Sequence, residues 1–152
     1  MGLLDYANSK SIWRGYDYYL EDRVYNIENI ADGVFKGTVQ GSGTKVYSST
    51  LDAFHPSKSK CNCPHANGKQ IICKHIVDLY FTAYEEEADR FYMESIEQEE
   101  KQKRLQEKLD NELETYISKM PKSELQTALL LVLREGPEWQ YNKFLREYLG
   151  EY

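Results

Sequence analysis

Apolar side chains recur at helical spacing near the start of the chain, directly after polar residues that can cap a helix. Asn8 or Ser9 can provide this cap, and the pattern predicts a helix that continues to about Asp22. Gly15 lies inside it, where glycine costs about 1 kcal/mol relative to alanine. We therefore expect Gly15 to permit close packing of the helix on a sheet. The apolar positions of this helix are Ile12, Trp13, Tyr16, Tyr19 and Leu20.

Three shorter segments have patterns typical of strands and are separated by turns that contain glycine. They cover residues 23–30, 34–40 and 44–51. Ala53 and Phe54 are expected to begin a fourth strand. The pattern therefore predicts a small antiparallel β-meander, with the N-terminal helix packed on one of its faces.

The second half of the chain is predicted to be helical. Apolar spacing, together with the positions of proline and glycine, predicts helices over 74–93, 95–119, 124–134 and 138–149. The long charged helix has a narrow apolar stripe, which usually packs on a neighbour in the same chain or on a second copy. Its members are Leu105, Leu109, Leu113, Tyr116, Ile117 and Met120. The predicted fold class is α+β: an N-terminal helix, a small antiparallel β-meander, a loop leading into a helix, and a helical C-terminal extension.

The length of 152 residues is that of one domain, or of a small domain with an appendage. We expect a domain over residues 1–93 and a helical extension over 94–152. No apolar run approaches the length that a membrane span needs, and no signal-peptide pattern is visible. We therefore expect an intracellular, cytoplasmic protein with reduced cysteines.

The net charge of −6 argues against a general polyanion-binding protein, but the charge is unevenly distributed. Residues 31–76 carry six lysines and two aspartates, whereas residues 77–120 carry thirteen acidic and six basic side chains. The segment 31–76 is therefore net basic, while the chain on either side of it is net acidic.

All three cysteines lie in one short stretch, as Cys61-x-Cys63 followed after nine residues by Cys73-x-His75. Three thiols and an imidazole form a four-ligand set of the kind that structural zinc binds with tetrahedral geometry. Cys61 and Cys63 can face one ion from an extended segment, where residues i and i+2 point to the same side. In a helix they do not, so we expect Cys73 in the entry to a helix and His75 in its first turn.

The sequence offers other interpretations of this cluster. His65 is a rival ligand, since it follows Cys63 at the same spacing, but His75 completes a symmetric pair and starts a helix. An odd number of cysteines without a signal peptide disfavours a disulfide framework. Redox catalysis would leave the second ligand pair unexplained, and unrelated buried cysteines would not cluster in this way. His55 is expected in a turn or at the surface.

The motif Cys61-x-Cys63 and Cys73-x-His75, followed by an apolar helix, resembles the SWIM zinc finger, whose signature is CxCx(n)CxH. The resemblance covers residues 9–84 and implies that these four residues bind one structural Zn²⁺. It also implies a DNA-binding or protein-interaction module, of the kind found in helicase-like ATPases, transposases and recombination proteins. The chain has no GxxxxGK[ST] motif of an ATPase motor. Upstream, the resemblance rests on Arg14-Gly15-Tyr16, Tyr18-Tyr19, Arg23-Val24, Gly37 and Gly41.

The first functional hypothesis is a zinc-stabilised module that binds DNA. Lysines of the ligand loop and of the following helix start are placed to contact phosphates. Because the second half of the chain is acidic, such binding is expected to be modest and strongly salt-dependent. The lysines expected to contact nucleic acid are Lys58, Lys60, Lys69 and Lys74.

The second hypothesis is a protein-interaction adaptor, in which the zinc is structural and the helical tail binds a partner such as an ATPase or a recombinase. The sequence also fits an N-terminal piece of a larger helicase-like protein. We expect no enzymatic activity, because four protein ligands leave no position for a water. Asp78 is expected to accept a hydrogen bond from the His75 imidazole or to stay exposed. No membrane partner and no small-molecule substrate are expected.

Overall fold

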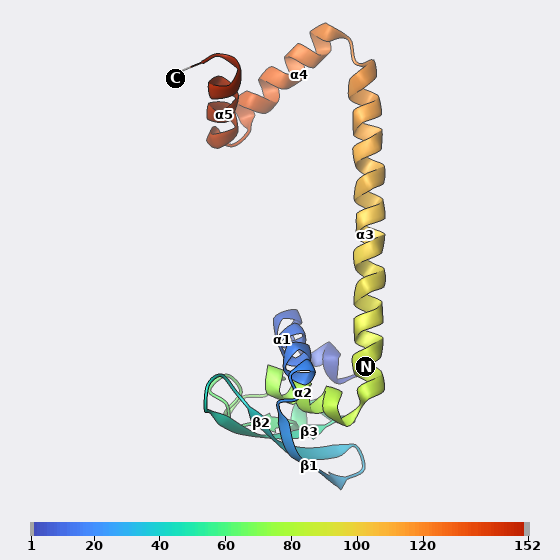
Figure 1. Ribbon diagram of the computed structural model, residues 1–152, viewed down its shortest axis with the longest axis vertical. Helices are drawn as coiled ribbons and strands as arrows, with labels where there is room; N and C mark the ends of the chain where they lie inside the picture. Colours follow the sequence, from blue (N-terminus) through green and yellow to red (C-terminus); the bar gives the residue numbers. More distant parts are fainter. Residues whose placement is uncertain (1, 151–152) are drawn as a thin grey trace. The chain divides into compact units, whose positions relative to one another are not determined.

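A computed structural model describes residues 2–150, which fall into two compact units, one ending at Ile96 and one beginning at Glu97 (Figure 1). The predicted α+β class is confirmed, with a four-stranded antiparallel sheet in the first unit and helices alone in residues 97–150. The first unit contains η1 (Leu3–Tyr6), α1 (Ser9–Leu20), β1 (Val24–Ala31), β2 (Val34–Gln40), β3 (Val46–Asp52), η2 (Pro56–Lys58), β4 (Lys60–Cys61), α2 (Lys74–Ala83) and the start of α3 (Glu85–Lys119).

The four strands form one sheet in the order β1-β2-β3-β4, with each strand antiparallel to its neighbour. Gly33 and Gly43 lie in the turns that join the first three strands, with φ of +67° and +68°. Glycine adopts this left-handed conformation without steric cost, which is why these turns can be tight. The three predicted strands are thus confirmed, with shifts of one or two residues at their ends.

The prediction of a fourth strand at Ala53 and Phe54 is wrong, because these residues form a bend. Asp52 holds this bend: its Oδ1 accepts a hydrogen bond from His55 N–H at 2.7 Å, and its own N–H donates to Ser59 Oγ at 3.0 Å. The chain therefore turns back before it pairs again. The fourth strand is β4, in which Cys61 lies opposite Ser49 of β3.

Helix α2 forms the centre of the first unit, since every residue from His75 to Phe81 is buried. It packs against α1 and contacts all four strands, so α2 rather than the N-terminal helix covers the sheet. A Cβ built on Gly15 of α1 would lie 2.5 Å from Cβ of Val77, which confirms the close approach at this glycine. The neighbour, however, is a helix and not the predicted sheet. A helix that is buried on every side needs several partners, and α1 supplies one of them.

The predicted helix over 74–93 is broken at Tyr84, where φ is −135° and ψ is 76°. Helix α2 ends at Ala83, and α3 continues without interruption from Glu85 to Lys119. The Tyr84 ring packs edge-on against Phe35 of β2, with their centroids 5.5 Å apart. This contact ties the break to the sheet, and three glutamates then open α3 at the end where a helix favours negative charge.

The second unit contains the rest of α3 together with α4 (Lys122–Glu135) and α5 (Glu138–Tyr148). Pro121 and Pro137 precede these last two helices; α5 begins at the predicted residue, and α4 begins two residues before the predicted position 124. Leu133 is buried, but most large apolar side chains of this unit are exposed. None of the helices within residues 2–150 is both long enough and apolar enough to cross a membrane.

Candidate metal centre

The four predicted ligands come together in one buried cluster. One ligand atom from each of Cys61, Cys63, Cys73 and His75 lies within 4.8 Å of all the others. His75 turns its Nδ1 toward the sulfurs, at 3.7 Å from Cys61 Sγ and 3.9 Å from Cys73 Sγ. Within residues 2–150, this is the only such group of histidine, cysteine or carboxylate side chains.

Local backbone structure explains how each ligand pair faces the centre. Cys61 ends β4, and Cys63 follows in the loop. Cys73 is the N-cap of α2, with extended φ and ψ of −91° and 168°, and His75 lies in the first helical turn. The arrangement that the spacing predicted for the second pair is therefore confirmed. Gly68 turns the loop between the pairs, with φ of +70°.

The distances in the cluster fit a tetrahedral zinc ion. With Zn–S bonds of about 2.3 Å and a Zn–N bond of about 2.0 Å, sulfur and nitrogen ligands stand about 3.6 Å apart. The two distances from His75 Nδ1 to Cys61 and Cys73 are close to this value. Three soft thiol ligands and one imidazole favour zinc over a hard cation such as Mg²⁺ or Ca²⁺. The residues present therefore fit the metal that the motif implies.

Hydrogen bonds within the cluster favour a thiolate at Cys61. The Cys73 thiol acts most strongly to lower the pKa of Cys61, and His75 and Ser49 lower it further against the opposing effect of burial. Ser49 Oγ donates to Cys61 Sγ at 3.2 Å. The same pairing with Cys61 raises the pKa of Cys73. One thiol thus ionises easily, and it is the thiolate that binds metal.

The imidazole of His75 is enclosed by two tyrosines. Its ring centroid lies 4.7 Å from that of Tyr47 on β3 and 5.7 Å from that of Tyr18 on α1. Packing on two different elements fixes the orientation of the ring, so that Nδ1 points to the sulfurs. The opposite nitrogen, Nε2, is buried and has no hydrogen-bond partner among the described residues.

Asp78 contradicts both expectations from the sequence. It is fully buried, and neither carboxylate oxygen has a hydrogen-bond partner within residues 2–150, so it neither accepts from His75 nor stays exposed. Burial raises the pKa of Asp78 to about 8, against an opposing effect of Arg23. The carboxyl group is therefore largely neutral near neutral pH. The sequence missed this burial because Asp78 lies on a helix that is covered on every side.

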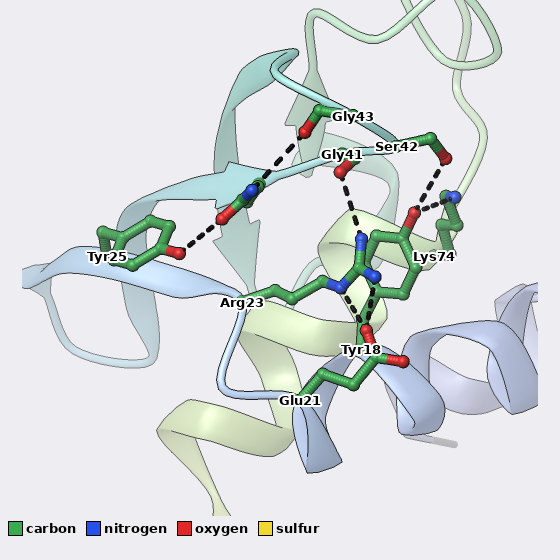
Figure 2. A network of polar contacts seen from close by, with 9 residues as sticks. Tyr18, Glu21, Arg23, Tyr25, Gly41, Ser42, Gly43 and Lys74 are labelled. Carbon is green, nitrogen blue, oxygen red and sulfur yellow. Dashed lines mark hydrogen bonds and ion pairs between the residues drawn. The ribbon is translucent and has the colours of Figure 1, made fainter.

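A polar network around Tyr18 connects α1, the start of β1, the β2–β3 turn and α2 beside the cluster (Figure 2). Lys74 donates to the Tyr18 hydroxyl, and the Lys74 ammonium and the Arg23 guanidinium each lie 4.1 Å from the centroid of the Tyr18 ring. Arg23 also donates to the carbonyl oxygen of Gly41 at 3.0 Å and forms an ion pair with Glu21. These contacts hold the residue between Cys73 and His75 in place.

Tyr18 is the member of this network whose acidity responds to the two cations. Burial acts to raise the pKa of Tyr18, but hydrogen bonds with Lys74 and Ser42 and the nearby positive charges lower it overall. At the level of sequence, only the resemblance of the chain to SWIM zinc fingers pointed to Tyr18. Its packing against His75, like that of Tyr47, needs the tertiary fold, and no local spacing could reveal it.

The four lysines expected to contact nucleic acid lie in different surroundings. Lys60 and Lys69 line one polar hollow of about 550 Å³ beside Cys61, together with the hydroxyl side chains of β3 and of the chain around η2. Lys58 belongs to η2, next to this hollow in sequence. Lys74 is engaged with Tyr18. The structure therefore brings two of the four lysines together.

The two other histidines lie outside the cluster. His65 is exposed and lines a hollow that also borders Cys63, Cys73 and His75. His75 and not His65 belongs to the buried set of four ligand atoms. His55 is at the surface, as expected, with its Nδ1 3.3 Å from Asp52 Oδ1.

No family model matches the chain, and comparisons with curated proteins and with solved structures find no similar protein.

Proposed function

We propose that this chain is a SWIM-type module in which Cys61, Cys63, Cys73 and His75 bind one structural Zn²⁺. The proposal is carried by one observation, the buried group of four ligand atoms within 4.8 Å of one another. Four protein ligands complete a tetrahedron, which supports a structural rather than a catalytic ion. Metal-binding thiols also favour a reducing compartment, so we place the protein in the cytoplasm.

The binding target that we propose for this module is DNA. Support comes from the hollow beside Cys61, which is lined by Lys60 and Lys69 together with Ser48, Thr50 and Ser57. Cations and hydroxyl donors are the groups that contact phosphate oxygens in protein–DNA interfaces. This segment is also the net basic part of an otherwise acidic chain. Contacts of this kind position a backbone without reading its sequence.

Fluorescence anisotropy with labelled duplex and single-stranded DNA tests this proposal. The zinc-loaded variant Lys60→Glu/Lys69→Glu is expected to bind at least about tenfold more weakly, with a smaller salt slope. The matched control is Lys36→Glu/Lys45→Glu, which makes the same charge change on the same basic segment but away from the hollow. The control should bind with little change. Equal losses of DNA affinity in both variants would mean that net charge alone explains the effect. That result would contradict a binding site at the hollow.

The remaining two lysines need separate treatment. Lys58→Glu should add a smaller loss, since Lys58 lies between Ser57 and Ser59 of the hollow but is not part of its lining. Lys74→Gln removes contacts with the ring and hydroxyl of Tyr18, so its effect on DNA binding must be measured beside its effect on thermal unfolding. A loss of DNA affinity in a fully stable Lys74 variant would add this residue to the interface.

A second candidate function is a protein-interaction adaptor. The observation in its favour is the apolar surface of the helical tail, where Leu129, Leu130 and Leu131 are between 44% and 54% exposed. Such a surface suits a protein partner, for instance a helicase-like ATPase or a recombinase, rather than DNA. DNA binding that is unchanged by Lys60→Glu/Lys69→Glu would favour this second function.

A further inference from the structure

The second half of α3 has an apolar stripe that nothing in residues 2–150 covers. Leu105, Leu109 and Leu113 follow one another at intervals of four residues and are 57%, 50% and 56% exposed. Residues at this spacing lie one above the other, about 40° apart around the helix. Tyr116 and Ile117 extend the stripe, also exposed. A stripe of this width matches the contact surface of one further helix.

On this stretch of α3, the net charge has opposite signs on the two sides of Leu109. The basic block, residues 101–108, has four basic and one acidic side chain, and the acidic block, residues 110–117, has three acidic and no basic side chains. Their net charges are therefore +3 and −3. Leu105 and Leu113 lie equally far from Leu109 on either side, whereas Tyr116 and Ile117 extend the stripe at its acidic end only.

We propose that α3 is a homodimer interface in which two copies pair antiparallel, with Leu109 at the two-fold axis. Each Leu105 then faces Leu113 of the second copy, and each basic block lies beside the acidic block of the second copy. A two-fold contact uses the same patch on both chains, so a patch that complements itself in charge and shape is what such a dimer needs. On one flank, Lys108 approaches Glu112 of the second copy.

The charge pattern also favours this pairing over a parallel one. A parallel pair in register would place +3 against +3 and −3 against −3 along the whole stripe. Like charges side by side on two helices are unfavourable, whereas opposite charges select orientation and partner. This complementarity of α3 with itself is the reason for choosing a second copy as the occupant, instead of an unrelated protein.

Helix α4 independently shows that the tail is incomplete as a single chain. Residues 128–133 are six consecutive apolar side chains, which point in all directions around a helix. Only Leu133 of the leucines in this run is buried, in a helix that contacts α5. A helix that is apolar on every side is normally enclosed by several others. A dimer doubles the number of helices available to enclose it.

The first test is the mass of the full zinc-loaded chain in solution, by light scattering after size exclusion and by sedimentation velocity. A dimer at micromolar concentration is expected, and Leu109→Ala should raise its dissociation constant by about tenfold or more. A chain that is monomeric at all concentrations overturns the proposal. In that case the stripe binds the chain's own tail or a different protein.

Charge reversal tests the pairing itself. A basic-block variant (Lys101→Glu, Arg104→Glu, Lys108→Glu) and an acidic-block variant (Asp110→Lys, Glu112→Lys, Glu114→Lys) should each dissociate, because like charges then face each other. An equimolar mixture of the two should form a heterodimer. The matched control, Lys10→Glu/Lys36→Glu/Lys45→Glu, makes the basic-block change on exposed lysines of the first unit and should leave the dimer intact. Circular dichroism confirms that each variant stays helical.

Cross-linking establishes the direction of the helices. In the antiparallel pair, a cysteine in place of Leu105 lies beside one in place of Leu113 of the second copy, so a mixture of Leu105→Cys and Leu113→Cys should form a disulfide-linked heterodimer. The Leu105→Cys variant alone should not cross-link, since its two copies are separated by eight residues, or about 12 Å along the axis. Efficient cross-linking of Leu105→Cys with itself, or a dimer that survives both charge reversals, overturns the antiparallel arrangement.

Discussion

The backbone of Gly15 lies so close to Val77 that a Cβ at position 15 would be 2.5 Å from both Cβ and Cγ1 of Val77. This is the contact at which α1 meets α2, and the same Cβ would be 2.9 Å from the carbonyl oxygen of Lys74. Lys74 lies between the candidate ligands Cys73 and His75. Packing at Gly15 is therefore linked directly to the backbone that presents half of the candidate metal centre.

Replacing Gly15 with alanine is expected to lower the free energy of unfolding by about 1–3 kcal/mol, the usual cost of overpacking a core. Alanine is the better helix former by about 1 kcal/mol, so helix propensity alone predicts the opposite sign. Urea unfolding of the zinc-loaded protein measures the difference. Gly2→Ala is the matched control, because a Cβ there meets nothing within 4 Å. A more stable Gly15→Ala protein would show that the α1–α2 contact is looser than described.

The identity of the metal ligands can be mapped by stoichiometry. Elemental analysis of the reduced protein is expected to find one zinc per chain, lost in Cys61→Ser and in His75→Ala. His65→Ala should retain the metal, because His65 is exposed and outside the buried set. Chelation of the zinc should also lower the thermal unfolding temperature, since a closed site stabilises only the folded chain. Loss of zinc in His65→Ala, or no zinc in the reduced wild type, would contradict this ligand set.

The hydrogen bond from Ser49 to Cys61 should strengthen metal binding. Ser49→Ala removes a donor to a buried thiolate, and we expect zinc affinity to fall about tenfold or more, as for other partners of metal ligands. Competition with a chromophoric chelator measures the change. Ser48→Ala is the matched control, since Ser48 is the adjacent residue on β3 and is exposed. Similar affinities in the two variants would leave Ser49 with a packing role only.

Asp78 should make the protein less stable as the pH rises. Burial raises its pKa in the folded protein to about 8, above the ordinary value of 3.8. Between these two values the folded chain binds the proton and the unfolded chain does not, so stability falls with increasing pH across this window. Asp78→Asn keeps the size and removes the charge. We expect the variant to be more stable than wild type by about 1–3 kcal/mol at pH 8. The two should be nearly equal at pH 4, because the unfolded wild-type chain also binds the proton near the ordinary pKa.

Urea unfolding at several pH values provides the measurement for Asp78. The matched control is Asp17→Asn, which removes a carboxylate from an exposed position on α1. Loss of zinc and of stability at pH 8 in the Asp78→Asn variant would contradict this prediction. It would mean that the ionised carboxylate accepts a hydrogen bond from Nε2 of His75 in the zinc-bound protein.

The sequence determined the parts of this protein whose cause is local. Apolar periodicity predicted α1 and the first three strands, and proline predicted the breaks before α4 and α5. The spacing of Cys61, Cys63, Cys73 and His75 predicted the cluster. Ligand spacing is informative because side chains at positions i and i+2 of an extended or capping segment can face one ion, whatever surrounds them. The same argument placed Cys73 at the helix entry.

Only the tertiary structure decided the features that depend on contacts distant in sequence. The Tyr84 ring at the helix break packs on Phe35 of β2, and Asp78 is buried because α2 is covered on every side. The chain bends after Asp52, so the fourth strand lies at Cys61. Periodicity reports which side of an element is apolar, but not which element will cover it. Local spacing therefore selected the ligands, while long-range packing decided how they are held.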